Sequence, residues 1–435
     1  MRAFADLPYR GGEHRRWMTE RLDPYYTGAW DVSRTAVWLS RTDSERYVAA
    51  GLSKPTMEEE RRTEAEAVQA LTLPGRYAEL ATLAAVGAWR TITVEQIAAL
   101  TGARVTKRMQ EILWATGLIA RGRMQLGVSA KTPMLMRPTQ SSDFGLLADR
   151  LRYVDWLGVT GGLPWLYGSQ ADRHNLLAVE VALRAAEYTP IAAILGDAYS
   201  KMTRFFPPVT QVPSFGPWTG DGVIVRSDGL RIALELTATA SVSLGEKFER
   251  WASFLARDTT SSTAVLFVEA RHPGLRSKYS DRAVLNRIRR MMAQAATSTM
   301  GRIQAGVPER MLMVSWTEWF PQPGHVCDDY VGLPVWRPTG RPDSPEGRYE
   351  RVSLLDPFEV AGPRLDRFPD GSMPRAVVAN SKLLYASPHW LRQGSAPDPR
   401  SIVALHSTGG IPGLVSPYDG GRARLAARAM KGKVT

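Results

Sequence analysis

The stretch that decides the fold is residues 220–237, which read GDGVIVRSDGLRIALELT. Two runs rich in β-branched residues flank a short turn whose third residue is Gly229, where a hairpin needs a left-handed conformation. This pattern predicts a β-hairpin. If the turn centres on Asp228, residues 226 and 230 are opposite each other and Asp221 lies opposite Glu235.

Two acidic side chains on this hairpin are the candidate chemical centre. Directly opposed residues on antiparallel strands have Cβ atoms about 4.5–5.5 Å apart. Two carboxylates at that distance repel each other unless a cation lies between them, and a divalent metal that takes one oxygen from each removes the repulsion. The alternative is structural, with Asp221 as a capping aspartate near a turn and Glu235 at the rim of a sheet.

The segments around the hairpin predict a small α/β core. A long helix is expected from Ala171, a second helix from about Ser243 to Leu255, and a third from Arg282 to Ala296. The uninterrupted apolar run 263–269 is typical of a strand buried in a mixed sheet, and 311–316 is a further expected strand. Helix, hairpin, helix and strand, with an acid on each hairpin strand, is the arrangement of a restriction-endonuclease-like core.

A second pattern, in residues 76–124, predicts a winged helix-turn-helix. It has an apolar helical stripe ending near Gly87, a capping box from Thr93 to Gln96, and a third helix starting near Val105. A basic strand follows, as in the wing of such domains. The third helix is expected to enter a major groove with its outward-facing residues Arg104, Thr106, Lys107, Arg108 and Gln110. Arg121 and Arg123 of the wing are expected to contact phosphates or the minor groove. The alternatives are a helical bundle with a solvated charged side and a protein-docking winged helix.

The order of these patterns resembles the replication-relaxation family of actinobacterial and plasmid proteins. The resemblance spans roughly Arg76 to Trp316 and rests on the winged helix, the helix that begins at His174, the pair Asp221 and Glu235, and the segment 247–251, KFERW. Members are associated with plasmid replication and mobilisation, and some resemble relaxases on a restriction-endonuclease-like fold.

The resemblance implies a metal-dependent phosphodiesterase that acts on DNA. Asp221 and Glu235 would bind Mg²⁺, and a lysine two residues after the second acid would stabilise the phosphate. This chain departs from the pattern, because Thr237 stands at that position. Lys247 on the next helix is the candidate replacement, and Glu180 on the preceding helix is a candidate third acid.

Length and composition bound the remaining possibilities. The chain has 435 residues, one cysteine, 44% apolar residues and a net charge of +12. One cysteine excludes an internal disulfide framework and a multi-cysteine metal site, and suits the cytoplasm. We find no G-x-S-x-G or Walker motif and no apolar run of transmembrane length, so a membrane is not an expected partner. The basic excess favours nucleic acid as partner.

The expected organisation is an α/β (α+β) protein with four parts: a helical or irregular segment 1–73, a winged helix-turn-helix 74–130, a restriction-endonuclease-like mixed-sheet core 131–318, and an extended region 319–435. The last part is rich in proline and glycine, ends in a basic tail from Arg422, and suggests a homo-oligomer or larger assembly.

Three functional hypotheses follow. The first is a cytoplasmic DNA-binding protein of a plasmid or phage, with a nuclease-like core that nicks DNA in replication, transfer or packaging. The second is a non-catalytic regulator with a degenerate core. The third is a structural component of a large assembly such as a phage particle, in which case the chain is located in the virion.

Overall fold

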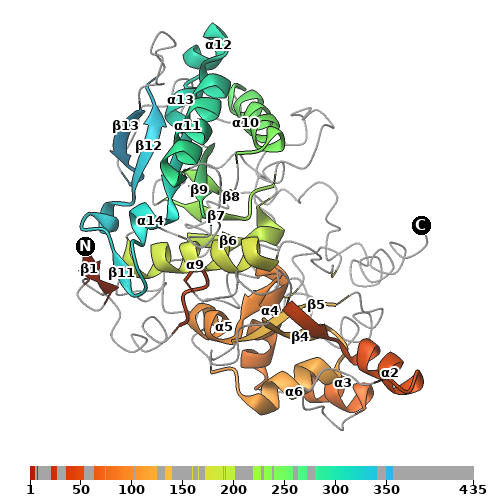
Figure 1. Ribbon diagram of the computed structural model, residues 1–435. Coiled ribbons are helices and arrows are strands. Elements are labelled where there is room, and N and C mark those ends of the chain that lie inside the picture. Colours follow the sequence, from red (N-terminus) through yellow and green to blue (C-terminus); the bar gives the residue numbers. More distant parts are fainter. Residues whose placement is uncertain are drawn as a thin grey trace, which may run out of the picture.

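The computed structural model describes residues 1–4, 7, 21–26, 36–52, 63–73, 75–101, 104–124, 133–139, 159, 165, 172–189, 191, 193–200, 219–226, 230–237, 240–257, 263–271, 280–339 and 349–355. These residues form a mixed α/β structure with three sheets (Figure 1). No helix among them is long and apolar enough to cross a membrane.

The N-terminal unit combines short helices with a four-stranded antiparallel sheet. Its helices are α2 (Arg41–Ala49), α3 (Glu64–Thr72), α4 (Tyr77–Trp89), α5 (Val94–Thr101) and α6 (Lys107–Ala115). Its strands are β2 (Ala36–Leu39), β3 (Ile92–Thr93), β4 (Ile119–Met124) and β5 (Met134–Pro138), in the sheet order β2-β4-β5-β3. The chain order from α4 to β5 is therefore helix, strand, two helices and a two-stranded ladder.

The starts of these helices follow the capping signals in the sequence. Thr93 and Gln96 form the expected reciprocal pair, in which the Gln96 N–H donates to Thr93 Oγ1 at 3.0 Å and the Thr93 N–H donates to Gln96 Oε1 at 3.1 Å. Thr106 caps α6 in a similar way, because its hydroxyl oxygen accepts from the Met109 N–H.

The larger unit is built on a seven-stranded mixed sheet. Its strands are β6 (Ala193–Gly196), β7 (Gly222–Val225), β8 (Arg231–Thr237), β9 (Thr263–Glu269), β10 (Met311–Ser315), β12 (Pro334–Pro338) and β13 (Tyr349–Ser353). Their order across the sheet is the same as their order along the chain. The pairs β8–β9 and β9–β10 are parallel and the other neighbours are antiparallel.

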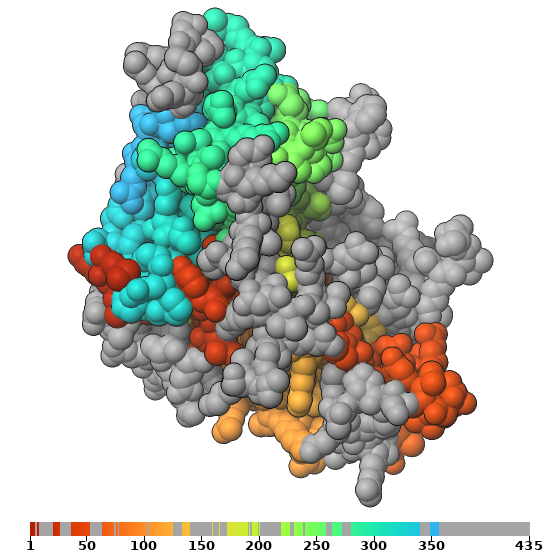
Figure 2. Space-filling view, viewed as in Figure 1, coloured from red at the N-terminus to blue at the C-terminus, as the bar shows by residue number. Residues whose placement is uncertain are grey.

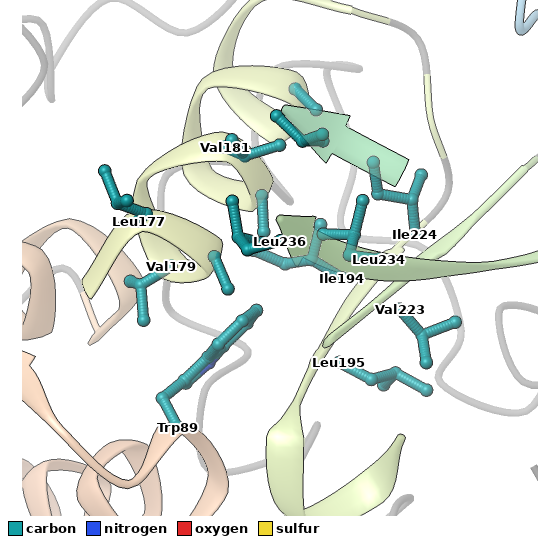
Figure 3. Packing of buried hydrophobic residues seen from close by; sticks show 14 of the residues in the cluster. Trp89, Leu177, Val179, Val181, Ile194, Leu195, Val223, Ile224, Leu234 and Leu236 are labelled. Carbon is teal, nitrogen blue, oxygen red and sulfur yellow. The ribbon is translucent and has the colours of Figure 1, made fainter. Parts of the chain in front are cut away.

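Helices cover both faces of this sheet. Its longer helices are α9 (Asp172–Tyr188), α10 (Val242–Leu255) and α11 (Asp281–Thr297), and its short ones are α12 (Met300–Gln304), α13 (Val307–Arg310) and α14 (Trp316–Trp319). Because side chains alternate along a strand, Leu234 and Leu236 of β8 pack toward α9, with Val181 nearby (Figure 3). Glu235 points to the other face, toward α10.

The hairpin register agrees with the sequence expectation. Gly222 pairs with Leu234 and Val225 with Arg231, so the numbers of paired residues sum to 456 as predicted. The turn residues 227–229 lie outside the described residues. The expected strand 263–269 and the helix and strand after it are also present, as β9, α11 and β10.

One expected boundary is corrected. The core does not stop at residue 318, because β12 and β13 extend the seven-stranded sheet. The first 73 residues, expected to be helical or irregular, contain α2 and α3 and also short strands, since β2 joins the N-terminal sheet and β1 (Arg2–Ala3) pairs with β11 (His325–Val326). Residues 356–435, with the expected basic tail, lie outside the described residues.

Candidate functional site

Glu235 is the centre of the candidate site. Its carboxylate is buried on β8 and faces α10. Lys247 Nζ donates to Glu235 Oε2, and the Trp251 indole N–H donates to Glu235 Oε1 at 2.7 Å. Lys247 and Trp251 are four residues apart on α10 and so lie on the same side of that helix. The structure thus brings Lys247 into direct contact with Glu235, as the sequence hypothesis required.

Asp221 lies immediately before β7 and is hydrogen-bonded to the strand that carries Glu235. Its N–H donates to the Leu234 carbonyl oxygen at 2.7 Å, and its Oδ2 accepts from the Leu236 N–H at 2.7 Å. These two backbone groups flank Glu235 on β8. Asp221 is therefore held at the level of Glu235 by the backbone, whereas Glu235 is held by side chains of α10.

The environment shifts the pKa values of the buried pair. Burial, together with the negative charge of Asp221, raises the pKa of Glu235 to about 7, although Lys247 opposes this effect. Burial alone would lower the pKa of Lys247, but Glu235 and Asp221 raise it. Lys247 therefore stays positively charged at neutral pH, beside a carboxylate that titrates near neutrality.

Two further side chains, His174 and Asp197, lie near Asp221 and were not part of the sequence hypothesis. His174 Nδ1, in the first turn of α9, lies 4.0 Å from Asp221 Oδ2, and its side chain is 45% exposed. Asp197 directly follows β6, and Asp221 directly precedes Gly222, the partner of Gly196 in the β6–β7 ladder. Burial and the charge of Asp221 both raise the pKa of Asp197. The position of Asp197 near Asp221 follows from the pairing of β6 with β7, and the sequence does not identify β6 as a strand.

Glu180, the candidate third acid, belongs to a different cluster. Its Oε1 accepts from Arg21 at 3.1 Å and from Arg184 at 2.9 Å, and its Oε2 accepts from Gln96 at 3.1 Å. Burial alone would raise the pKa of Glu180, but the charges of Arg21 and Arg184 lower it to about 2. Its carboxylate is thus committed to a buried ion-pair network, and the expectation that it adds a third acid to the site is wrong.

The donor set for a divalent metal consists of two carboxylates. Within the described residues no group of three or more His, Cys, Asp or Glu side chains is arranged to hold a metal ion. Mg²⁺ commonly uses only one or two protein carboxylates and fills its other positions with water and substrate phosphate. Asp221 and Glu235 fit that limited requirement, because each oxygen of Glu235 accepts one hydrogen bond and a carboxylate oxygen has two lone pairs.

Most of the expected DNA-contacting side chains are accessible. Arg104, Thr106, Lys107, Arg108 and Arg123 are exposed and Gln110 is partly exposed. They lie at the start of α6 and on β4. Lys107 Nζ lies 4.0 Å from Glu111 Oε1, at the limit of an ion pair.

Arg121 is the exception, and the expectation that it reaches a phosphate is wrong. It lies on β4 between β2 and β5, paired with Leu39 on one side and Met136 on the other. Its side chain is only 5% exposed, and burial lowers its pKa. Arg123, two residues further along and paired with Val37 and Met134, is the exposed arginine of this strand.

The N-terminal unit is seated directly on the edge that carries Asp221. Trp89, at the end of α4, packs against Gly196 and Gly222, where an added Cβ would lie 3.0 and 3.1 Å from its ring atoms (Figure 3). Arg90 then turns the chain with φ of 64°, and its Nε lies 3.3 Å from Asp197 Oδ2. The two units therefore meet within a few residues of the candidate site.

The first residue of α9 provides a second junction. Asp172 accepts from the Thr91 hydroxyl at 2.5 Å and from the Trp38 indole N–H at 3.0 Å. Arg137 Nη1 lies 3.6 Å from the same carboxylate. The helix turn that presents His174 to Asp221 is thus anchored by three side chains of the N-terminal unit.

No protein-family model, curated protein or solved structure matches this chain.

Proposed function

We propose that the chain is a DNA-binding protein with a nuclease-like core that hydrolyses a DNA phosphodiester bond with the help of Mg²⁺. The observation that carries the proposal is the contact between Lys247 and Glu235, with Asp221 bonded to the backbone on both sides of Glu235. A cation and two carboxylates at one sheet edge form the set that phosphoryl transfer requires.

The topology of the core supports this assignment. The order α9, β6, β7, β8, α10, β9 contains the helix, hairpin, helix and strand expected of a restriction-endonuclease-like core. The antiparallel β7–β8 ladder and the parallel β8–β9 ladder put the acidic pair at the edge where α10 begins. Thr237 stands where the family pattern has a lysine. In this proposal Lys247 takes the role of that lysine, because its position on α10 puts its ammonium group against Glu235.

In this proposal each polar side chain has a separate role. Asp221 and Glu235 would hold Mg²⁺, which when bound polarises a phosphoryl oxygen and lowers the pKa of water. Lys247, protonated at neutral pH, would lie against the phosphate and stabilise the charge that develops on it. The buried indole of Trp251 would keep the Glu235 carboxylate oriented.

The N-terminal unit supports the DNA-binding part of the proposal. The order from α4 to β5 fits a winged helix in which α6 enters the major groove and Arg123 contacts phosphate. Together with the core it also fits the proposed membership of the replication-relaxation family. A role in replication, transfer or packaging of a plasmid or phage follows from that membership and remains part of the proposal.

The decisive experiment is a plasmid nicking assay with the full chain and with Asp221→Asn and Lys247→Met variants. We expect nicking that requires Mg²⁺ or Mn²⁺ and falls about 100-fold or more in each variant, the typical cost of losing one charge-stabilising group. Glu246→Gln is the matched control, because Glu246 is an exposed residue next to Lys247 on α10. Equal nicking by wild type and both site variants would show that the activity belongs to another site or to a contaminant.

One observation favours a non-catalytic regulator as the second candidate. Both oxygens of Glu235 already accept hydrogen bonds, from Lys247 and Trp251, so a metal would have to share an oxygen with one of these donors or displace it. For a regulator we expect DNA binding without nicking at any Mg²⁺ or Mn²⁺ concentration, and unchanged binding in Asp221→Asn.

A further inference from the structure

Helix α11 carries an unusual concentration of arginines on its exposed side. Arg282, Arg287 and Arg290 are all exposed, whereas Ile288 and Met292 are buried. At about 100° per residue the three arginines span about 140° of the helix circumference, on the side opposite the buried residues, and about 12 Å along the axis. Part of the surface formed by residues 280–305, coloured green to teal, is open on the face shown in Figure 2.

These three arginines have no ion pair or hydrogen bond with any residue that the structure describes. Arg289 of the same helix shows the contrast, because its Nη2 donates to Glu318 at 3.0 Å and its guanidinium lies 5.0 Å from the Trp336 ring centre. Arg289 therefore has a structural role, and its neighbours on α11 do not share it.

Acidic side chains near this surface do not neutralise it. Asp281, at the start of α11, is paired with Arg271 at 3.0 Å. On α10, Glu249 is paired with Arg302 at 2.7 Å, and Glu246 makes no ion pair with Arg250 within the described part of the chain. Arg250 is itself exposed and adds a fourth positive charge.

The basic surface lies beside the helix that carries Lys247. Helix α11 packs beside α10, where a Cβ on Gly245 would lie 3.2 Å from the Met291 methyl carbon (Figure 1). The charge of Arg250 influences Lys247 directly, lowering its pKa in opposition to the two acids. The Asp281–Arg271 pair fixes the start of α11 at the end of β9, next to the end of β8.

We propose that this surface, made of Arg282, Arg287 and Arg290 on α11 and Arg250 on α10, binds the phosphate backbone of duplex DNA and guides it to the candidate site. The inference rests on the proposed function and adds a contact surface separate from α6. Guanidinium groups form paired hydrogen bonds with phosphate oxygens, and exposed arginines without an acidic partner in the described part of the chain keep these donors available for phosphate. Because such contacts release counterions, the surface predicts a specific salt dependence.

The test measures binding of a fluorescent duplex by the full chain at several salt concentrations, for wild type and for Arg282→Gln/Arg287→Gln/Arg290→Gln. Each lost phosphate contact lowers the slope of log K against log salt by about 1, so the triple variant should lose about 3 from the slope and bind more weakly at each salt concentration. The matched control is Arg2→Gln/Arg337→Gln/Arg351→Gln, which removes the same charge from arginines already paired with acids. The control should keep the wild-type slope.

The outcomes separate this inference from the proposed function. If the wild type binds DNA and the α11 variant has the same slope, the inference that α11 contacts DNA is overturned and the proposed function is left intact. An equal loss in the control also overturns it, since net charge alone then accounts for the effect. Absence of wild-type binding to duplex DNA, even at low salt, refutes both. Thermal melting of each variant checks that the fold is retained.

Discussion

Glu235 combines a buried carboxylate with one cation, one indole donor and a second carboxylate nearby. Burial favours the protonated acid, whereas the ammonium of Lys247 favours the ionised form. The net result, a pKa of about 7, means that a small change in surroundings alters the charge of this group. A bound cation would remove the proton and leave the site ionised.

This balance predicts a pH dependence of stability. Because the pKa of Glu235 rises from 4.5 in the unfolded chain to about 7 in the folded protein, its favourable contribution is complete below pH 4.5 and is lost as the pH rises through 7. At about 1.4 kcal/mol per unit, the loss is up to about 3 kcal/mol. Glu235→Gln removes this contribution.

The measurement is urea denaturation of wild type and Glu235→Gln at pH 5 and pH 8 without divalent metal. The free energy of unfolding of the wild type should fall relative to the variant between these two values. Parallel pH profiles for the two proteins would show that Glu235 titrates in its ordinary range.

At the scale of elements, the contact between α4 and the β6–β7 ladder depends on two missing side chains. A Cβ on Gly196 would lie 2.3 Å from the carbonyl oxygen of Ala88, which is backbone and cannot move aside like a side chain. The ring of Trp89 then fills the space above Gly222. Helix and ladder approach each other this closely only because both strands present glycine.

We therefore expect Gly196→Ala to destabilise the protein by about 1–3 kcal/mol, the usual cost of overpacking. Gly301→Ala is the matched control, because an added Cβ would come no closer than 4.0 Å to any side chain of the described residues, that of Thr299, and the site is helical, where alanine is favoured by up to about 1 kcal/mol. Thermal melting of both variants tests this. Equal melting temperatures for Gly196→Ala and wild type would refute the close approach.

Elements with strong local patterns were predictable from the sequence, and those that depend on distant partners were not. The β7–β8 register follows from the turn and the alternation of residues 220–237. The strand β6 has only four residues and is recognised as a strand only through its pairing with β7. The burial of Arg121 was not predictable from the basic pattern of its strand, because Arg123, two residues further along, is exposed. The contact of Lys247 with Glu235 depends on how α10 packs against β8, and the sequence of α10 alone does not determine that packing.

At the scale of the whole molecule, buried polar contacts join the two units. Gln96 of α5 donates to the Leu176 carbonyl oxygen and to Glu180 of α9, both at 3.1 Å. Arg21 from the N-terminal segment pairs with Glu180 and Glu187. Because these groups are buried, removal of one partner leaves a charge without compensation.

We therefore expect Glu180→Ala to lower the free energy of unfolding by about 3–5 kcal/mol and to destabilise both units together. The matched control, Glu45→Ala, removes an exposed carboxylate paired with Arg41 at 2.9 Å and should cost less than about 1 kcal/mol. Circular dichroism and tryptophan fluorescence should follow a single unfolding transition in each case. Separate transitions in the two signals would show that the units unfold independently.

The strand order of the large sheet has a consequence for synthesis on the ribosome. Each strand from β6 to β13 lies beside the previous sheet strand in the chain, so no strand has to be inserted between two that are already paired. As residues emerge from the N-terminal side first, the sheet is able to grow outward at a single edge. A nascent chain that has just released β9 already contains every strand needed for Asp221 and Glu235 to meet.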